Sequence, residues 1–468
     1  MSAVPSLVIE PQEQKSKISR LAKSDGSPLS VMIDGFNLSL EKGTGVATYA
    51  RNLSFCLRDL GCSVDVLYGS SATRSHSPLL KEVSFYDSHS LTLSRWQRVR
   101  KRVRSLVSLN RNRAFEVPIT GKVVPDTFQS RLPHFDRIWN ATDLYEKAAS
   151  HLDIFGAVNY VTVDPVPDIV HWTYPLPIRV RGCPNIYTLH DVVPLRLPYS
   201  TLDKKDKYLA LLKWIARTAD HVVTVSEASR RDLIDIVGIQ PERITNTYQA
   251  VSIPAKYRNK PEDAVRSEVE GMFGLKYKNY YLFYGSIEPK KNVGRLIEAY
   301  LASGVKAPLV IVGAQAWKSE SELRLLKSLN EGGDLRSSRR IIQLEYAPYP
   351  LLMTLVRGAR AVLFPSLYEG FGLPVLEAML LGTPVLSSRT SSIPEVAGDA
   401  ALLVNPYEAQ DICAGINALD SDPSRRSQLA EQGRQRASLF SKTAYTQRLQ
   451  EVYEKQLLAC SGSTECVQ

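Results

Sequence analysis

The sequence lacks the features of a membrane-spanning, secreted or metal-binding protein. No uninterrupted apolar run approaches the roughly 20 residues that a bilayer span requires. The first residues, Met1-Ser-Ala-Val-Pro5, lack the basic start and apolar core of a signal peptide. The six cysteines are scattered without the C-x-x-C spacing that is typical of zinc sites. We therefore expect a cytoplasmic protein with reduced thiols and no metal site, and peripheral attachment to the inner face of the membrane stays open.

Length and charge set two further expectations. A chain of 468 residues exceeds the roughly 250 to 300 residues at which a single hydrophobic core stops growing, which favours two domains. The hydrophobic fraction of 44% against 23% charged residues is typical of globular proteins. The formal net charge of +10 favours a polyanionic partner, such as anionic lipid, a phosphorylated substrate or nucleic acid.

Short apolar runs alternate with amphipathic helical patterns in both halves of the chain. In the first half, the strand-like runs 30–34 and 63–68 flank a helical pattern over 46–60, and in the second half a run at 280–284 precedes a helical pattern over 293–303. This alternation is typical of α/β domains with parallel sheets, whose ligands bind beyond the carboxyl ends of the strands. We predict a flexible tail at 1–28, an N-terminal Rossmann-like domain at 29–252, a C-terminal Rossmann-like domain at 253–440, and a helix that returns to the N-terminal domain, with a tail, at 441–468.

The strongest functional signal lies between Ala361 and Pro384. It is typical of a strand, a glycine loop, a helix with Pro374 in its first turn, and a stop at Gly382. Free N–H groups at the start of such a helix can bind phosphate or hydroxyl oxygens, and the glycines allow a ligand to approach the backbone. Glu369 and Glu377 flank this anion-binding position. Carboxylates there would repel a bare phosphate, but they can accept hydrogen bonds from sugar hydroxyls beside the phosphates. The combination predicts a nucleotide-sugar site.

This segment resembles the E-x(7)-E signature of the family-4 retaining glycosyltransferases, also described as glycosyl transferases group 1. The matching stretch reads Pro365-Ser-x-x-Glu369-Gly-Phe-Gly-Leu-Pro374-x-x-Glu377-Ala-Met-x-x-Gly382. Further stretches extend the resemblance from about residue 31 to 440, in the family's order: Gly43-Thr-Gly45, Leu189-His190-Asp191, Val225-Ser226-Glu227, Gly285 to Asn292 and Ile393 to Ala400. The resemblance is to bacterial mannosyltransferases of polysaccharide and lipopolysaccharide synthesis.

The resemblance implies a GT-B fold, in which two doubly wound Rossmann-like domains face each other across a cleft and the C-terminal domain holds the donor. By motif, it implies that Glu377 binds the ribose hydroxyls and Glu369 the donor sugar. Lys291 is implied to neutralise the diphosphate, and a fixed counter-charge there would stabilise the departing nucleotide. The other residues implied to bind the donor are Gly43, Gly45, Gly285, Lys290, Gly370, Phe371, Gly372 and Leu373.

His190 follows an apolar strand, so we expect its ring to lie at a carboxyl end, facing the cleft. The resemblance implies a contact of this histidine with the donor sugar or the acceptor, and we group it with Glu369 and Lys291 as catalytic candidates. A purely structural histidine is the alternative. Ser226 and Glu227 match a recurrent family motif, although Ser226 as a helix cap explains them almost as well.

A basic segment near 95–115 falls in the N-terminal domain. It carries Arg95, Arg98, Arg100, Lys101, Arg102, Arg104, Arg111 and Arg113, with Trp96, Val99, Val103 and Leu106 at helical spacing. Such a helix can lie on an anionic membrane surface and would present a lipid-linked acceptor there. A solvated insertion is the alternative.

The sequence therefore predicts a retaining hexosyltransferase that moves a sugar from a nucleotide diphosphate sugar to a glycan or a polyprenyl-diphosphate-linked acceptor. GDP-mannose is the first candidate donor and a UDP-sugar the alternative, with no obligatory cofactor and no nucleic acid. A GT-B nucleotide-sugar epimerase is one rival interpretation. A non-catalytic protein that binds a nucleotide sugar or nucleic acid is another. Neither rival explains Glu369, Glu377 and Lys291 as well as glycosyl transfer does.

Overall fold

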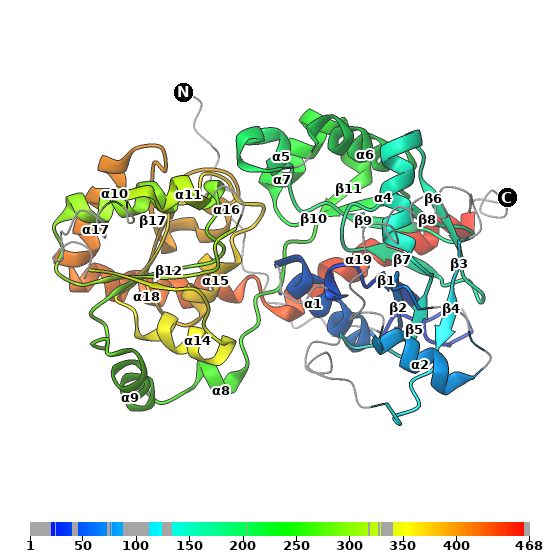
Figure 1. Ribbon diagram of the computed structural model, residues 1–468, viewed down its shortest axis with the longest axis horizontal. Helices are drawn as coiled ribbons and strands as arrows, with labels where there is room; N and C mark the ends of the chain where they lie inside the picture. The colour runs from blue at the N-terminus through cyan, green and yellow to red at the C-terminus, as the bar shows by residue number, and fades with distance from the viewer. Residues whose placement is uncertain are drawn as a thin grey trace.

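Two parallel sheets lie side by side and form the two halves of the molecule (Figure 1). The computed structural model describes residues 20–462, except 24, 40–44, 73–74, 76, 88–111, 124–132, 203, 317–318, 326–327 and 329–339. Most strands are short and fully buried, as expected for parallel strands covered by helices on both faces. The predicted fold class, two Rossmann-like α/β domains, is confirmed.

The N-terminal sheet has eight strands in the order β11-β10-β9-β7-β1-β2-β5-β4. Its pairs are parallel except for the edge strand β4, which runs antiparallel to β5. A separate three-stranded sheet has the order β3-β6-β8. The strands are β1 Ser30–Asp34, β2 Ser63–Tyr68, β3 Asn112–Arg113, β4 Phe115–Val117, β5 Arg137–Asn140, β6 Asn159–Thr162, β7 Ile169–Trp172, β8 Ile178–Val180, β9 Asn185–Thr188, β10 His221–Thr224 and β11 Ile244–Asn246.

The C-terminal sheet has six parallel strands in the order β14-β13-β12-β15-β16-β17. These are β12 Tyr281–Tyr284, β13 Leu309–Val312, β14 Ile341–Leu344, β15 Ala361–Phe364, β16 Val385–Ser388 and β17 Leu402–Val404. The central strands β12 and β15 are hydrogen-bonded neighbours, so the loops that follow them leave the sheet at the same edge.

The helices connect these strands. In the N-terminal half they are η1 Asn37–Ser39, α1 Gly45–Asp59, α2 Pro78–Asp87, α4 Leu144–Phe155, α5 Val193–Arg196, η3 Pro198–Ser200, α6 Lys205–Thr218, α7 Glu227–Asp232, η4 Leu233–Val237 and η5 Pro241–Arg243. In the C-terminal half they are α8 Ala255–Arg258, α9 Glu262–Phe273, η6 Pro289–Lys291, α10 Val293–Ser303, α11 Ser319–Glu322, α14 Tyr349–Gly358, α15 Leu373–Leu380, α16 Ile393–Ala397, η7 Gly398–Ala400, α17 Ala409–Ser421, α18 Pro423–Ser438 and α19 Lys442–Gly462.

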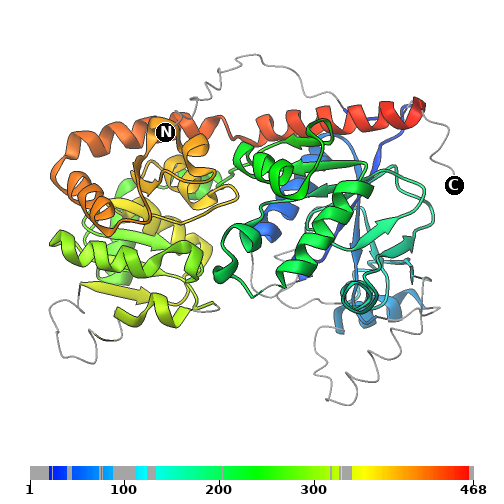
Figure 2. The ribbon, with the colours of Figure 1, turned by 90° about the horizontal axis from the view of Figure 1, so that it is seen from above.

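The C-terminal helix α19 lies along the N-terminal domain, whereas α18 lies on the C-terminal domain (Figure 2). Two buried tyrosines of α19 fix this position. The Tyr453 hydroxyl lies 2.6 Å from His171 Nδ1 in β7, and the Tyr445 hydroxyl donates to the Tyr49 hydroxyl in α1 at 3.2 Å. Buried polar groups of this kind need a partner, so these bonds specify where the helix docks.

The described part of the predicted flexible tail is packed. Leu21 is buried, and its N–H donates to the carbonyl of Leu60 at 2.9 Å. Ala22 forms an isolated antiparallel bridge with Pro28. Residues 20–23 thus pack on the N-terminal domain through Leu21, whose partner Leu60 is distant in the sequence.

Candidate active site

The helix α15 begins at the carboxyl end of the C-terminal sheet, one loop after β15. Gly372 caps it in a left-handed conformation, with φ 98°, and no side chain caps the helix. This conformation favours glycine, and a Cβ atom on Gly372 would also lie 2.6 Å from Ile393 Cδ1, at the end of a side chain that would have to shift. Gly382 ends the turn after α15 with φ 72°. Pro374 has no N–H, and the Val375 N–H donates to the carbonyl of Gly372 at 3.0 Å, so the N–H groups that this end of α15 can offer to a ligand are those of Gly372 and Leu373.

Lys291 and Glu369 form a nearly buried ion pair at this edge. The Lys291 Nζ lies 2.7 Å from Glu369 Oε1, and the side chains are 12% and 8% exposed. Lys291 ends η6, which follows β12, and Glu369 lies in the loop after β15. Burial alone would raise the pKa of Glu369, but the neighbouring Lys291 and Lys290 ammonium groups hold it below its ordinary value. Glu369 is therefore a carboxylate at neutral pH.

Lys290 belongs to the same charged group. Its Nζ lies 3.6 Å from Glu288 Oε1. Burial opposes the charge on Lys290, yet the surrounding Glu288, Asp191 and Glu369 carboxylates raise its pKa above the ordinary value. Asp191 comes from the N-terminal domain, so Lys290 lies where the two domains meet.

Glu377 occupies a separate and less polar position inside α15. The Tyr284 hydroxyl donates to Glu377 Oε2 at 3.1 Å and also contacts the carbonyl of Pro374 at 2.8 Å. Burial raises the pKa of Glu377 to about 7, although the bond from Tyr284 opposes the shift. A buried carboxyl with a single hydroxyl donor retains acceptor capacity for ligand hydroxyls.

His190 lies at the carboxyl end of the N-terminal sheet, as the sequence predicts. Its Nε2 lies 2.9 Å from the carbonyl oxygen of Thr173, so Nε2 carries the proton. Its ring meets the Tyr49 ring edge to face at 4.8 Å. Burial lowers the pKa of His190, which leaves the ring neutral with Nδ1 as an acceptor.

The two sheet edges meet at Gly370. A Cβ atom there would lie 2.9 Å from both the carbonyl oxygen of His190 and Asp191 Oδ2. The glycine next to Glu369 thus lets the loop after β15 touch the His190-Asp191 backbone. Lys291, Glu369, Lys290 and His190 are brought together in this region.

Hydrogen bonds also join the domains around this contact. Glu395 Oε2 and Oε1 accept from the N–H groups of Glu227 and Ala228 at 3.2 and 3.3 Å, at the start of α7. Burial raises the pKa of Glu395 to about 7. The Ser229 hydroxyl donates to the carbonyl of Gly370 at 3.3 Å.

A second interdomain contact combines one polar bond with an apolar cluster. The Tyr368 hydroxyl binds the Asp232 carboxylate, which also pairs with Arg196. Val193, Leu197, Leu367 and Tyr368 form a small buried cluster beside it. The loop after β15 therefore packs on the N-terminal domain through both hydrogen bonds and apolar contacts.

Other predicted donor-binding residues have different positions. Gly43 lies outside the described residues, and Gly45 begins α1. Gly285, with φ 137°, packs against Gly313, whose Cβ would lie 1.8 Å from the Gly285 carbonyl oxygen. The Phe371 ring is buried against Tyr248 and Phe440, so only the backbone of Phe371 is left to contact a ligand at the start of α15. Leu373 is the first residue of α15.

Several residues of this region were not predicted as site residues. Tyr284 is the last residue of β12, and its position at a carboxyl end was the available signal. Glu395 and Asp191 lie in motifs that the sequence already marks, but their contacts across the domains depend on the packing of distant segments. Ser226 caps α7, because its hydroxyl accepts from the N–H of Ser229 at 3.0 Å, which confirms the capping interpretation.

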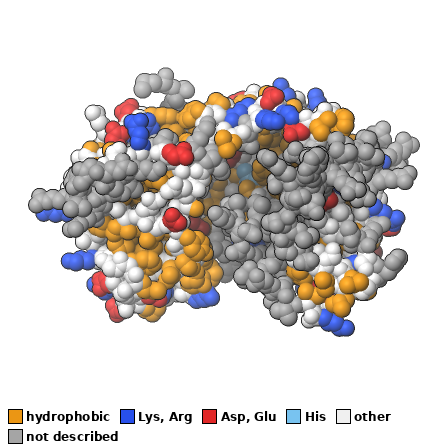
Figure 3. Space-filling view, in the orientation of Figure 1, with side chains coloured by type: hydrophobic (Ala, Val, Ile, Leu, Met, Phe, Trp, Pro, Cys, Tyr) orange, Lys and Arg blue, Asp and Glu red, His pale blue; other side chains and the backbone are white. Residues whose placement is uncertain are grey.

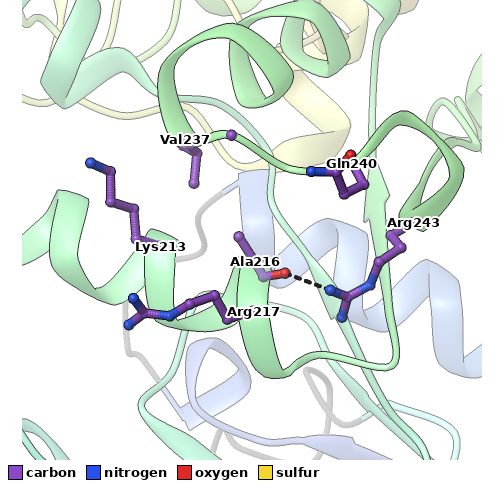
Figure 4. A pocket seen from close by; sticks show the side chains of 7 residues that line it. Lys213, Ala216, Arg217, Val237, Gln240 and Arg243 are labelled. Carbon is purple, nitrogen blue, oxygen red and sulfur yellow. Dashed lines mark hydrogen bonds between the residues drawn. The ribbon is translucent and has the colours of Figure 1, made fainter.

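A separate pocket of about 350 Å³ lies on the N-terminal domain between α6 and the turn around Gly238 (Figure 4). It is lined by Lys213, Ala216, Arg217, Val237, Gly238, Gln240 and Arg243. The Arg243 guanidinium donates to the carbonyls of Ala216 and Ala219 at the end of α6, so its role is structural.

No helix among the described residues is long and apolar enough to cross a bilayer. In the same part of the chain, no group of three or more His, Cys, Asp or Glu residues is arranged to hold a metal ion. The basic segment predicted near 95–115 lies largely outside the described residues. Its described end includes Arg113, which pairs with Asp164 at 3.3 Å.

Comparison with solved structures gives the class of fold. The protein has a TM-score of 0.61 with Anabaena HepE in complex with UDP and glucose, at 15% identity, covering 91% of this chain and 100% of that one. It has a TM-score of 0.54 with WaaG, a glycosyltransferase involved in lipopolysaccharide biosynthesis, at 14% identity and with 91% and 99% covered. Two facing Rossmann-like domains of this kind define the GT-B fold.

Sequence comparison gives the family. The model of the family described as Glycosyltransferase Family 4 matches residues 43–253, and the model of the family described as Glycosyl transferases group 1 matches residues 273–436. The O-antigen chain mannosyltransferase B of Escherichia coli is 32% identical over 273 residues, covering 57% of this chain and 68% of that protein. The serotype-specific mannosyltransferase WbdA of Escherichia coli is 28% identical over 262 residues, and the match spans only 32% of its length. The chain belongs to glycosyltransferase family 4, and the predicted resemblance is confirmed.

Proposed function

We propose that the protein transfers a hexose from a nucleotide diphosphate sugar to a glycan or lipid-linked acceptor, with retention of configuration, in the synthesis of a cell-surface polysaccharide or lipopolysaccharide. GDP-mannose is the first candidate donor, because the similar sequences include mannosyltransferases of O-antigen chains. A UDP-sugar is the alternative, since a protein of similar fold binds UDP and glucose.

The observation that carries the proposal is the Lys291–Glu369 pair beside the uncapped start of α15. The N–H groups of α15 and the two lysines supply positive potential for a diphosphate. Glu369, kept ionised by those lysines, accepts hydrogen bonds from hydroxyls of the donor sugar. Glu377 lies farther along α15 and accepts from the ribose.

Lys291 and His190 have different roles in the proposed transfer. Lys291 stabilises the negative charge that grows on the departing diphosphate, and this interaction strengthens as the glycosidic bond breaks. In a retaining reaction, the acceptor hydroxyl attacks from the face on which the nucleotide leaves, and its proton passes to a phosphate oxygen of the leaving group. His190 Nδ1 accepts a hydrogen bond from a sugar hydroxyl beside this face.

The test is to incubate the protein with a panel of nucleotide sugars and to follow the products by proton NMR. Release of nucleoside diphosphate, with the α-anomer as the first sugar product of an α-linked donor, is the expected result. An altered sugar that stays attached to its nucleotide would favour the epimerase. Saturable binding without any product would favour a binding protein.

Membrane attachment is part of the proposal, and a surface patch on the N-terminal domain supports it. Leu79, Leu80 and Val83 of α2 are 41%, 56% and 41% exposed, and Ile119 is 44% exposed. The buried Glu82 accepts from the N–H of Thr120 at 3.0 Å and so holds Ile119 beside α2. Hydrophobic side chains gather in this region, at the lower right of Figure 3.

The charge around this patch favours anionic lipid. Lys81 and Lys122 flank it, and the basic segment near 95–115 follows α2 in the sequence. Flotation with liposomes tests this point. We expect co-flotation that requires anionic lipid and is reduced by Leu80→Glu, whereas equal recovery with and without anionic lipid would contradict it. Leu458→Glu is a matched control, because Leu458 is 74% exposed on α19, outside this patch.

A further inference from the structure

The carboxyl edge of the N-terminal sheet carries aromatic side chains that the donor chemistry does not use. Strands β1 and β7 are parallel neighbours, with Ile33 in register with His171. The chain after β1 continues as Gly35-Phe36-Asn37, and the chain after β7 as Thr173-Tyr174. Both segments therefore emerge side by side at the edge that faces the donor domain.

Two aromatic rings from these segments form a stacked pair. The Phe36 and Tyr174 ring centroids are 5.6 Å apart at an interplanar angle of 26°. Tyr145 supports Phe36 from the side, edge to face at 5.1 Å. Phe36 and Tyr174 both remain partly exposed, whereas most aromatic rings of this domain's core are fully buried.

The residue that follows Phe36 carries a buried amide without a partner. The Asn37 side chain is 6% exposed, and its Nδ2 has no hydrogen-bond partner among the residues that the structure describes. An unsatisfied buried donor destabilises the folded state, so such a group is retained most readily where a ligand satisfies it. Asn37, the residue after Phe36, has such a donor for a ligand oxygen.

Hydrogen bonds connect the aromatic pair of Phe36 and Tyr174 to His190. Asp34 accepts from the N–H of Phe36 at 3.2 Å and from the N–H of Thr173. The carbonyl of Thr173 then accepts from His190 Nε2 at 2.9 Å. The aromatic pair is thus held in a fixed position relative to His190, and Gly370 of the donor domain touches the backbone on the other side of this histidine.

We propose that Phe36, Tyr174 and Asn37 form a subsite for a sugar ring of the acceptor. The inference rests on the proposed function and adds the acceptor's chemistry to it. A sugar ring presents C–H bonds on one face and hydroxyls at its rim, which suits aromatic rings beside one hydrogen-bond donor. The subsite binds a saccharide unit of the growing chain, whereas a lipid tail would leave the Asn37 amide unsatisfied.

The test separates acceptor binding from donor binding. Mannotriose is the acceptor probe, and its binding is measured by saturation-transfer NMR, while GDP-mannose and UDP-glucose binding is measured by calorimetry. We expect Phe36→Ala and Tyr174→Ala to weaken mannotriose binding at least tenfold and Asn37→Ala severalfold, with donor binding within twofold of wild type. Thermal melting checks that each variant is folded.

Phe155→Ala is the matched control, because Phe155 is 56% exposed at the far end of α4. This variant should bind mannotriose as the wild type does. A folded Tyr174→Phe variant, which keeps the ring, should also bind normally. Wild-type protein that binds a nucleotide sugar but not mannotriose, or aromatic variants that bind it as tightly as wild type, would overturn the subsite and leave the proposed function standing. Failure to bind any nucleotide sugar would instead overturn the function.

Discussion

The two sheet edges that meet at Gly370 are built from different side chains. The C-terminal edge carries the charges of Lys290, Lys291 and Glu369, which compensate one another at close range. The N-terminal edge carries Phe36, Tyr174 and a neutral His190, with polar groups satisfied mainly by backbone. Positive potential suits a diphosphate, and aromatic faces suit a sugar ring. On the proposed function, this difference predicts that the donor is recognised by charge and the acceptor by shape and hydrogen bonding.

The largest effect is expected at the charged edge. Lys291→Ala should lower turnover of the donor by about 10²–10³-fold, the range found when one fixed electrostatic group is removed from a transition-state site. The initial rate of nucleoside diphosphate release measures this effect. Lys291→Arg keeps the charge and should retain more activity than the alanine variant.

Stability provides a control for this experiment. Removing Lys291 leaves Glu369 with Lys290 as its remaining counter-charge. Removing one partner of a buried pair commonly costs about 3–5 kcal/mol, and Lys290 should reduce that cost here. Thermal melting must therefore accompany the kinetics. A folded Lys291→Ala enzyme with turnover within twofold of wild type would show that the charged edge does not act on the leaving group.

The next effect concerns Glu377, which we expect to bind the nucleotide rather than act in the chemical step. Glu377→Ala should weaken GDP-mannose binding by about 10–100-fold, because hydrogen bonds to a charged group contribute about 1.5–3 kcal/mol. Calorimetric titration measures the affinity. An unchanged Kd would remove Glu377 from the donor site.

The contact between the two edges can be tested at Gly370. Gly370→Ala places a Cβ atom 2.9 Å from Asp191 Oδ2 and from the carbonyl oxygen of His190, so the domains must move apart. We expect turnover to fall about tenfold or more, because small displacements at a reacting centre are costly.

Gly271→Ala is the matched control for this substitution. Gly271 lies in α9, and a Cβ atom there meets nothing within 4 Å. Its activity should be unchanged and its stability slightly raised, by roughly 0.5–1 kcal/mol. Equal activity in both glycine variants would show that the approach of the two edges does not matter.

The smallest effect is a shift in pH dependence. Burial raises the pKa of Glu377 to about 7, so the protonated form dominates below that pH and the carboxylate above it. Affinity for GDP-mannose, whose diphosphate diester does not titrate in this range, should rise with pH through a midpoint of about 7 and level off above it. Tyr284→Phe removes the hydroxyl that donates to this carboxyl and should move the midpoint to higher pH.

Glu377→Gln separates this titration from that of Glu395, whose pKa is also about 7. The glutamine variant cannot ionise at position 377 and should show a flatter profile than wild type. A profile identical to that of wild type would assign the pH dependence to another group.

The fold and the charged edge were largely predictable because their signals are local. Apolar runs of strand length mark β12 and β15, and Pro374 and Gly382 mark the first turn and the end of α15 through the backbone conformations they favour. Lys291, Glu369 and Glu377 follow from the family motif. The roles of the individual residues in this motif stay predictions.

The remaining features depend on contacts between distant segments. The bond from Tyr284 to Glu377 and the bonds from the α7 backbone to Glu395 have no local pattern. The antiparallel edge strand β4 and the small sheet of β3, β6 and β8 consist of two to four residues each, too short for a period to show. The stacking of Phe36 on Tyr174 likewise arises only because β1 and β7 are neighbours in space.

The most direct test of the account is a side-by-side measurement of GDP-mannose affinity and turnover in wild type, Glu377→Ala and Lys291→Ala. The account predicts that Glu377→Ala loses affinity at least tenfold, whereas Lys291→Ala loses less affinity than that and turns over about 10²-fold more slowly or worse. Parallel losses of affinity and turnover in the two folded variants would contradict the separate roles assigned to these residues.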